Sequence, residues 1–372
     1  MRIGFICWRQ GGGTSDYVSA SPKKSWMKDL KKETRGEYKG KYPFEKALIA
    51  AMQEKYKNDV IVFINKYDEK LLVQNDVNFV LSLNLLNAWE KSDAEYDRVY
   101  KIVQNPKMKI YPNLKEQLFL YDKGNYLKYF EKKGIPIAPT FIIKDDRNPE
   151  KIINKIKKQG WDSFVLKPHR AYATTGIGLF KLTDKKLEEK VKKYLDKNKK
   201  FPAFICQELI DGFSKFWEIK SYWINGKFRY LVPTHCWSWL ENACAHNSEI
   251  DYSHLKKVSR DVIKQVKTLG KKVVKTYPKM NKYSDPPIFL RIDFGCCVDN
   301  AMDGKNYFLN EIEYAGCATL TEVASVNNAF DIWVREYYNK AKHIYQMMNK
   351  SNKTLKKSKK KTKRISRRRR SK

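Results

Sequence analysis

The stretches Phe289-Leu290-Arg291-Ile292-Asp293-Phe294 and Leu309-Asn310-Glu311-Ile312-Glu313 decide the fold, because both are apolar strands interrupted by charge. Successive side chains of a strand point to opposite faces, so the arginine and aspartate of the first stretch share a face, as do the two glutamates of the second. If the strands are neighbours, three carboxylates meet, which is costly unless a cation neutralises them. Their oxygen atoms suit Mg²⁺. A sheet whose polar face meets solvent is the alternative, but two interruptions in so short a region favour the metal.

A second pattern lies upstream, where the apolar strand Phe164-Val165-Leu166 ends in Lys167 and Pro168. The loop that follows, residues 171–178, consists largely of small residues, hydroxyls and glycine. Backbone N–H groups of such a loop can wrap phosphate oxygens, and the loop can move as a lid over a ligand. Taken alone, the pattern is explained better by a hairpin with an exposed lysine.

The first hundred residues alternate between strand and helix patterns. Strands are expected at 3–8, 60–64 and 79–83, with a helix at 44–56. This order predicts a small α/β domain with parallel strands. The glycine triplet at 11–13 lacks the Lys-Ser/Thr pair of a P-loop and is weak evidence for a phosphate site.

The rest of the chain predicts an α/β (α+β) protein with further lobes. Helices are expected at 113–133, 149–160, 185–198, 258–277 and 329–348, and strands at 163–167, 177–182, 203–209, 218–224, 228–232, 288–294 and 307–312. Asn225-Gly226 predicts a tight hairpin between two of these strands. We expect an N-terminal α/β domain over 1–105, a central lobe over 106–205, a C-terminal lobe over 206–348 and a tail over 349–372.

The composition excludes several classes of protein. Hydrophobic residues make up 42% of the 372 residues, which is enough for a core and argues against global disorder. No apolar run approaches the roughly 18 residues that span a bilayer, and the run 3–8 is too short for a secretion signal. The seven cysteines include no Cys-x-x-Cys pair, so we expect a reducing compartment and an intracellular, cytoplasmic protein.

The charge is concentrated at the C-terminal end. The 75 Lys and Arg against 41 Asp and Glu give a formal net charge of +34, and residues 350–372 hold 14 of the basic residues and no acid. Such a block repels itself and cannot bury a core, so a disordered tail is expected. Its charge favours nucleic acid or another polyanion as partner of Lys350–Lys372, and leaves nuclear or virion association open. A tail that only increases solubility is the alternative.

A zinc site is an alternative to the magnesium and phosphate sites described above. The chain carries two histidines and two cysteines within twelve residues, at His235, Cys236, Cys244 and His246. Histidine and cysteine bind zinc, but this spacing matches no common zinc finger. Two tryptophans among them, Trp237 and Trp239, favour either a loop that faces the substrate or packing.

In their order along the chain, these pieces resemble the ATP-grasp superfamily of carboxylate–amine and carboxylate–thiol ligases, over roughly residues 105–320. Asp122-Lys123 with the segment Gly134-Ile135-Pro136-Ile137-Ala138-Pro139-Thr140 is similar to the first lysine and the entry to the fold. Lys167 with residues 174–178 resembles the second lysine and its mobile glycine-rich loop. Gln207-Glu208-Leu209-Ile210 resembles the hinge where backbone groups read adenine. The strand at 218–220 and the two charged strands complete the series.

The resemblance implies two α+β lobes that enclose ATP, with Mg²⁺, or Mn²⁺ as an alternative, bound by Asp293, Glu311 and Glu313. The ATP-binding residues that it implies are Lys123, Lys167, Thr174, Thr175, Gly176, Gly178, Gln207, Glu208, Leu209 and Glu218. It implies catalytic roles for Arg291, which would steady the oxyanion, and for Lys220, which stands where many relatives have arginine. A lysine there has the charge but not the bidentate geometry of arginine.

The implied reaction is a ligation, as in the similar glutathione synthetase, protein-glutamylating and tubulin-tyrosine ligases. A carboxylate substrate, such as an amino acid or peptide, attacks the γ-phosphate, and an amine acceptor then displaces phosphate from the acyl phosphate. A kinase of an anionic small molecule, and a silent ATP-grasp scaffold that binds nucleic acid through its basic tail, are the alternatives. The chain departs from the family at Glu313, usually asparagine, and at Tyr314-Ala315-Gly316-Cys317, so metal preference and the acceptor end can differ.

Overall fold

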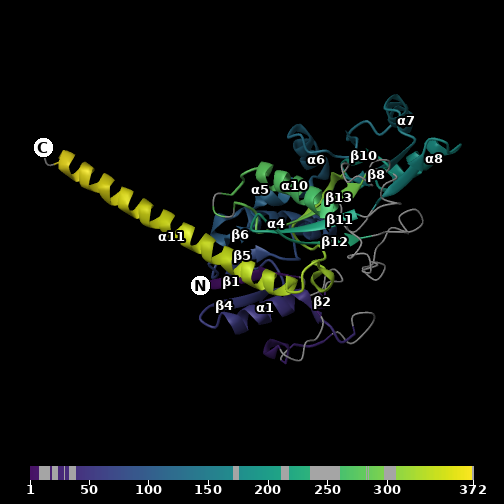
Figure 1. Cartoon of the computed structure of the whole chain (residues 1–372). Helices are drawn as coiled ribbons and strands as arrows, with labels where there is room; N and C mark the ends of the chain where they lie inside the picture. Colours follow the sequence, from purple (N-terminus) through teal and green to yellow (C-terminus); the bar gives the residue numbers. More distant parts are fainter. Residues whose placement is uncertain are drawn as a thin grey trace.

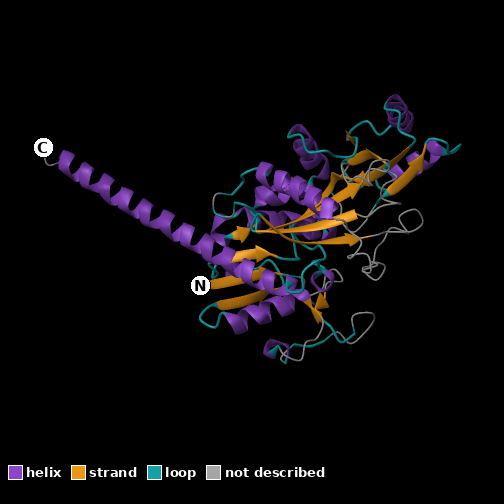
Figure 2. Ribbon diagram, in the orientation of Figure 1, coloured by secondary structure: helices purple, strands orange, loops and turns teal. Residues whose placement is uncertain are grey.

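The computed structural model describes residues 1–7, 17–18, 24–28, 30–32, 39–170, 176–210, 218–234, 260–281, 283, 285–296 and 307–370. Within these residues three four-stranded sheets and one two-stranded ribbon form the framework. Figure 1 shows the sheets in series, from the blue strands near the N-terminus, through the sheet of β11 and β13, to the sheet of β8 and β10. Helices pack along all three, as the purple ribbons of Figure 2 show.

The first sheet is parallel, with strand order β4-β1-β5-β6. Its strands are β1 (Arg2–Ile6), β4 (Val60–Ile64), β5 (Val77–Val80) and β6 (Ile110–Tyr111). The associated helices are α1 (Phe44–Lys55), α2 (Glu69–Leu72), α3 (Leu85–Lys91) and α4 (Asp93–Gln104), with the ribbon β2 (Tyr17–Val18) and β3 (Tyr42–Pro43) alongside. The prediction of parallel strands in the N-terminal part is confirmed.

The second sheet is antiparallel, with order β7-β10-β8-β9. It comprises β7 (Thr140–Ile143), β8 (Ser163–Pro168), β9 (Gly178–Lys181) and β10 (Phe204–Glu208), covered by α7 (Pro149–Lys158) and α8 (Leu187–Lys197). Ile156, Phe164 and Val191 are fully buried between sheet and helices. This lobe therefore has a core of its own.

The third sheet is also antiparallel, with order β12-β11-β13-β14. It comprises β11 (Glu218–Ile224), β12 (Lys227–Thr234), β13 (Phe289–Cys296) and β14 (Tyr307–Glu313). Helices α5 (Leu114–Tyr121), α6 (Lys123–Lys132) and α10 (Arg260–Thr276) share a hydrophobic core with it. The short 3₁₀ turns are Ser25–Met27, Pro106–Met108 and Thr321–Val323.

The last helix, α11 (Ala329–Arg370), joins the first and third sheets. Its buried Trp333 donates an indole hydrogen bond to the Tyr230 hydroxyl of β12 over 2.8 Å, and its Tyr337 ring packs against Phe5 of β1. Beyond the body the helix continues as backbone to Arg370 and projects into solvent, as the yellow end in Figure 1 shows. Lysine and arginine are good helix formers, so a helical backbone is compatible with this highly charged segment.

Two other differences from the sequence prediction have simple causes. The single helix expected at 113–133 is two helices, because Asp122 has non-helical φ of −92° and ψ of 83°. Helix α4 was missed because it buries only a short apolar stripe, Val99, Ile102 and Val103. The domain boundaries at 105, 205 and 348 stay predictions.

Candidate active site

The charged residues of the third sheet lie in two rows across three strands. Antiparallel pairing places Lys220 of β11 opposite Asp293 of β13, and Asp293 opposite Glu311 of β14. The next row places Arg291 opposite Glu313. Directly opposed side chains on one face of a sheet are close neighbours, so the register alone brings these five residues together.

Ion pairs connect the rows. Arg291 donates from Nε to Oδ1 of Asp293 over 2.9 Å. Its Nη2 lies 2.7 Å from Oε2 of Glu313. The ammonium of Lys220 lies 3.2 Å from Asp293 and 2.5 Å from Glu218. Asp293 is only 1% exposed, so its charge depends on these two cations.

Lys123 joins the same cluster from helix α6. Its ammonium forms an ion pair with Glu311, and its backbone N–H donates to the carbonyl of His169 over 3.1 Å. One turn later, the Tyr126 hydroxyl accepts a hydrogen bond from the N–H of Ile312 over 3.2 Å. The start of α6 is thereby held between β8 and β14, which fixes Lys123 over the carboxylates.

The carboxylates differ in how well their charge is compensated. Burial alone would raise the pKa of Asp293, but Arg291 and Lys220 outweigh it and lower that pKa. The pKa of Glu311 is also lowered, because Lys123 and Lys167 outweigh burial. The pKa of Glu313 is raised, since burial is larger than the opposing effect of Arg291. Glu313 is therefore the least stabilised anion of the three.

Lys167 ends strand β8, as the sequence predicted, and faces the same cluster. Burial, and then the nearby charge of Lys123, lower its pKa to about 8. Among the described residues no carboxylate lies within ion-pair distance of its ammonium. A partly buried lysine next to a second lysine is a favourable place for a phosphate, whose charge would offset both.

The glycine-rich loop is described only in part. Thr174 and Thr175 lie outside the described residues. Gly176 has a φ of +73°, and a Cβ there would lie 2.9 Å from the Pro168 ring. A Cβ on Gly178 would lie 2.8 Å from the Tyr194 ring, and the Tyr194 hydroxyl donates to the carbonyl of Leu166 over 3.1 Å. Both glycines are thus required by packing, whatever the loop binds.

The expected hinge residues follow strand β10. The Gln207 side chain donates to Oγ1 of Thr140 over 2.8 Å, and is buried. The N–H groups of Glu208 and Leu209 donate to the carbonyls of Pro139 and Ser163, each over 3.0 Å. Any contact of this segment with a base must therefore use other atoms.

Asn310 is a site residue that the sequence analysis missed. Its side chain donates to Glu218 over 2.8 Å. Simple alternation places Asn310 on the face opposite Glu311, but the pairing of β13 and β14 shifts register between Asp293 and Phe294. Such a bulge reorients side chains and is common beside active sites. The polar residue within an apolar strand was the available signal.

The donor set suits a magnesium ion in its chemistry, since three carboxylates on neighbouring strands offer hard oxygen ligands. In the described part of the chain, no three acidic, histidine or cysteine side chains are already gathered as metal ligands. Each of the three carboxylates instead pairs with Arg291, Lys220 or Lys123. The predicted histidine–cysteine cluster at 235–246 lies outside the described residues.

Comparison with known proteins supports the fold by structure and not by sequence. No protein-family profile matches the chain, and no curated protein is detectably similar to it in sequence. Among solved structures, D-cycloserine synthetase DcsG has a TM-score of 0.59 at 10% identity, covering 92% of this chain and 100% of its own. The D-alanine–D-alanine ligase of Bacillus anthracis in complex with ATP has a TM-score of 0.55 at 13% identity, covering 95% and 99%.

A third similar structure is N5-carboxyaminoimidazole synthase of Aspergillus clavatus, solved with ADP and a ribonucleotide. Its TM-score is 0.54 at 12% identity, with 90% of this chain and 76% of that chain covered. The similarity to all three extends over 90–95% of this chain. Together with the order of sheets, lysines and charged strands described above, it shows that this chain has the ATP-grasp fold.

Proposed function

We propose that the chain is an ATP- and Mg²⁺-dependent ligase that joins a carboxylate to an amine. The observation that carries the proposal is the cluster of Lys123, Lys167, Lys220 and Arg291 around buried Asp293 and partly buried Glu311 and Glu313 on an ATP-grasp fold. Buried and partly buried cations of this density suit a polyphosphate and a developing oxyanion. The ligase and synthase names of the structural neighbours agree with it at this general level.

The chain's own residues have separate roles in this proposal. Lys123 and Lys167 bind the phosphates of ATP, and Lys220 holds Asp293 and Glu218 in place. Arg291 stabilises the acyl phosphate and the tetrahedral oxyanion. Asp293, Glu311 and Glu313 would hold the metal, which when bound supplies charge neutralisation for the phosphates.

The reaction needs no protein nucleophile. A carboxylate oxygen of the substrate attacks the γ-phosphorus, the bond to the bridging oxygen breaks, and ADP leaves. The acceptor nitrogen then attacks the acyl carbon, phosphate leaves, and the amine loses a proton. Most of the catalysis is positioning and electrostatic stabilisation, as in other phosphoryl transfers.

A nucleotide-binding experiment tests the first part. Mg-ATP should raise the unfolding temperature, because a ligand that binds only the folded state stabilises it. Lys167→Ala should remove most of that rise, whereas Lys151→Ala, at an exposed salt bridge on α7, should not. No rise in unfolding temperature and no heat of binding would reject ATP as a ligand.

The product experiment tests the second part. A library of carboxylates and amines is screened for ADP release, and mass spectrometry identifies the product. A condensed product with free phosphate supports the ligase. A stable phosphorylated product would instead make the protein a kinase, and ATP binding without turnover would make it a silent scaffold.

We also propose that residues 350–372 bind a polyanion such as nucleic acid. The observation in favour is their 14 basic residues without an acid, on a helical backbone that extends away from the body to Arg370 (Figure 1). In the described residues no helix is long and apolar enough to cross a membrane.

A further inference from the structure

Two tyrosines connect the segments that carry Lys123 and Glu313. Tyr121 is the last residue of α5, two residues before Lys123, and Tyr314 directly follows Glu313 at the end of β14. The Tyr314 hydroxyl donates a hydrogen bond to the Tyr121 hydroxyl, and the two ring centroids lie 5.5 Å apart at an interplanar angle of 44°. Tyr314 is only 4% exposed, so water competes little for this bond.

The acceptor of this bond is also held by the loop that follows β5. Burial raises the pKa of the Tyr121 hydroxyl, against the opposing hydrogen bonds that it receives from Tyr314 and from the backbone N–H groups of Leu86 and Leu85. Both leucines lie in the first turn of α3. The oxygen of Tyr121 is therefore fixed by α3 as well as by its tyrosine partner.

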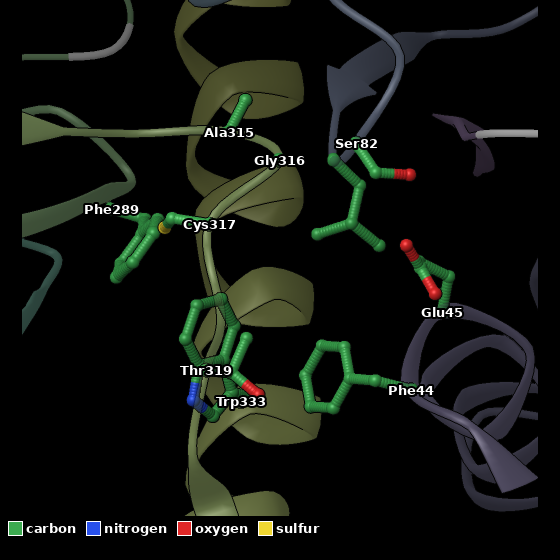
Figure 3. A pocket seen from close by; sticks show the side chains of 10 residues that line it. Phe44, Glu45, Ser82, Phe289, Ala315, Gly316, Cys317, Thr319 and Trp333 are labelled. Atoms are coloured by element: carbon green, nitrogen blue, oxygen red, sulfur yellow. The ribbon is translucent and has the colours of Figure 1, made fainter. Parts of the chain in front are cut away.

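The segment after Tyr314 is tied to the same loop. The N–H of Gly316 donates to the carbonyl of Leu81 over 3.1 Å, and Figure 3 shows Gly316 beside Ser82. Gly316 has a φ of +69°, and a Cβ there would lie 3.3 Å from the carbonyl oxygen of Ser82. The loop after β5, the junction of α5 with α6, and the end of β14 therefore meet beside the charged cluster.

The tyrosine bond is one of two bonds that bracket the charged residues. Helix α6 is also held to β14 by the hydrogen bond between Tyr126 and Ile312. Along the helical segment, Tyr121 precedes Lys123 and Tyr126 follows it. Along the strand, Ile312 precedes Glu313 and the second tyrosine follows it. Two bonds on either side of the charged residues fix the orientation of the two segments as well as their distance.

We infer that the hydrogen bond from Tyr314 to Tyr121 is a positioning contact that sets the ammonium of Lys123 relative to the carboxylate of Glu313. The inference rests on the proposed function, which assigns the ammonium to the phosphates of ATP and the carboxylate to the metal. Their relative position matters, because a misplacement of about 1 Å can lower a rate by roughly a hundredfold. Tyr314 stands where the sequence departs from the ligases that it resembles, so that resemblance does not imply this contact.

Phenylalanine variants test the contact, because they remove a hydroxyl and keep the ring. Tyr314→Phe removes the donor and leaves Tyr121 with its backbone donors. Tyr121→Phe removes the acceptor and leaves buried donors without a partner, so it should destabilise the protein more. Tyr129→Phe is the matched control, since it removes another tyrosine hydroxyl bond of α6, the one to the carbonyl of Thr276 over 2.8 Å.

Three measurements are made on each protein: ADP formation with the carboxylate and amine that the product screen identifies, Mg-ATP binding by calorimetry, and hydrogen exchange of single amides by NMR. Tyr314→Phe should lower kcat at least tenfold. It should change the KM and the affinity for Mg-ATP no more than threefold, because ATP also has contacts outside this one. Without nucleotide, the amides of Lys123 and Ile312, which are bonded across these segments, should exchange at least tenfold faster.

Tyr129→Phe should leave kcat and the exchange of both amides unchanged. The double variant of Tyr121 and Tyr314 should have the kcat of Tyr121→Phe alone, because the two hydroxyls act through one bond. If Tyr121→Phe does not fold, Tyr314→Phe and the control decide the inference.

A folded Tyr314→Phe protein with the kcat of the wild type, or with unchanged exchange at Lys123 and Ile312, overturns this inference and leaves the proposed function standing. An equal loss of kcat in Tyr129→Phe also overturns it, since any hydroxyl of this core would then have the same effect. Absence of Mg-ATP binding in the wild type rejects the proposed function instead. Exchange at the two amides still decides whether the tyrosine bond holds the two segments together in that case.

Discussion

Arg291 is the residue on which the charge balance of the candidate site depends. Its guanidinium contacts both Asp293 and Glu313, which stand on different strands. An arginine held by two carboxylates is compensated twice over, so it can release one carboxylate and keep its charge paired. Glu313, whose pKa burial raises, is the one that is easier to release. An asparagine at 313, the residue usual in the ligases that the sequence resembles, would remove one of the two carboxylates that pair with Arg291.

This balance predicts different effects for the three carboxylates. Asp293→Asn and Glu311→Gln should each reduce ADP formation by at least a hundredfold. Each removes a negative charge from the carboxylates that would hold the metal. Asp293→Asn should also cost about 3 kcal/mol of unfolding free energy, since it leaves two buried cations with less compensation. Glu313→Asn should reduce ADP formation tenfold or less. ADP release and urea unfolding measure both effects, and a Glu313→Asn protein as inactive as Asp293→Asn would contradict the assignment.

Lys167 predicts a proton linkage. With a pKa of about 8, its amine is largely neutral at pH 9 in the free protein, whereas an ordinary lysine stays charged up to about pH 10.4. Bound phosphate would raise that pKa, so Mg-ATP binding at pH 9 should take up close to one proton. At about pH 7 and below the lysine is already mostly charged, and the uptake should fall. Calorimetry in two buffers of different ionisation enthalpy measures the uptake.

Lys167→Arg is the matched control for this linkage, because arginine stays charged throughout the range. It should bind Mg-ATP at pH 9 with little or no proton uptake. An uptake equal to that of the wild type would place the titrating group elsewhere.

At the scale of elements, local patterns predicted strands and turns better than they predicted where helices end. The hairpin of β11 and β12 was predictable, because Asn225 and Gly226 accept positive φ, here 54° and 68°. The interruption of the expected helix at Asp122 was not predictable, because the helical spacing of apolar residues continues through it. The break depends on His169, the residue that follows β8, because its carbonyl accepts a hydrogen bond from the N–H of Lys123. The bulge that turns Asn310 toward Glu218 likewise requires a partner strand.

The break at Asp122 leads to a prediction about α6. Asp122 caps this helix, and its Oδ1 accepts from the N–H of Asn125 over 3.0 Å. Asp122→Ala should cost about 1 kcal/mol of unfolding free energy and weaken Mg-ATP binding, because Lys123 is the first residue of the helix. Asn148→Ala removes the equivalent cap of α7, where the side chain accepts from Lys151 over 3.1 Å.

Asn148→Ala should therefore cost a similar free energy and leave nucleotide affinity unchanged. Denaturant unfolding and calorimetry on the two variants give both quantities. Equal loss of affinity in both would mean that stability, and not the position of Lys123, controls binding.

At the scale of the whole molecule, α11 connects the body that carries the candidate site to the basic end. Ala341 and Ile344 are fully buried, and the Tyr111 hydroxyl lies 3.7 Å from the sulfur of Met348. The sequence predicted a helix at 329–348 here, because burial of one helix face leaves a periodic apolar signal. It could not locate the end of the helix, since helical backbone beyond that point needs no apolar face.

This division predicts where the chain can be cut. Removing residues 350–372 spares every α11 contact named above, and no residue of the candidate active site lies beyond Cys317 in the sequence. The shortened protein should therefore keep its unfolding temperature and its ATP turnover with a small substrate. It should lose most of its affinity for DNA or RNA, because 14 basic residues are removed.

Salt dependence checks the cause of that loss. Each contacted phosphate of duplex DNA releases counterions, so log affinity should fall by roughly 0.9 per phosphate for each tenfold rise in salt. The slope should be steep for the full chain, and shallow both for the shortened protein and for a control in which the basic residues of 350–372 are replaced by glutamine. Equal binding by all three would move the polyanion site to the basic body. Loss of ATP turnover in the shortened protein alone would show that the helical backbone beyond Lys350, and not its charge, supports the active site.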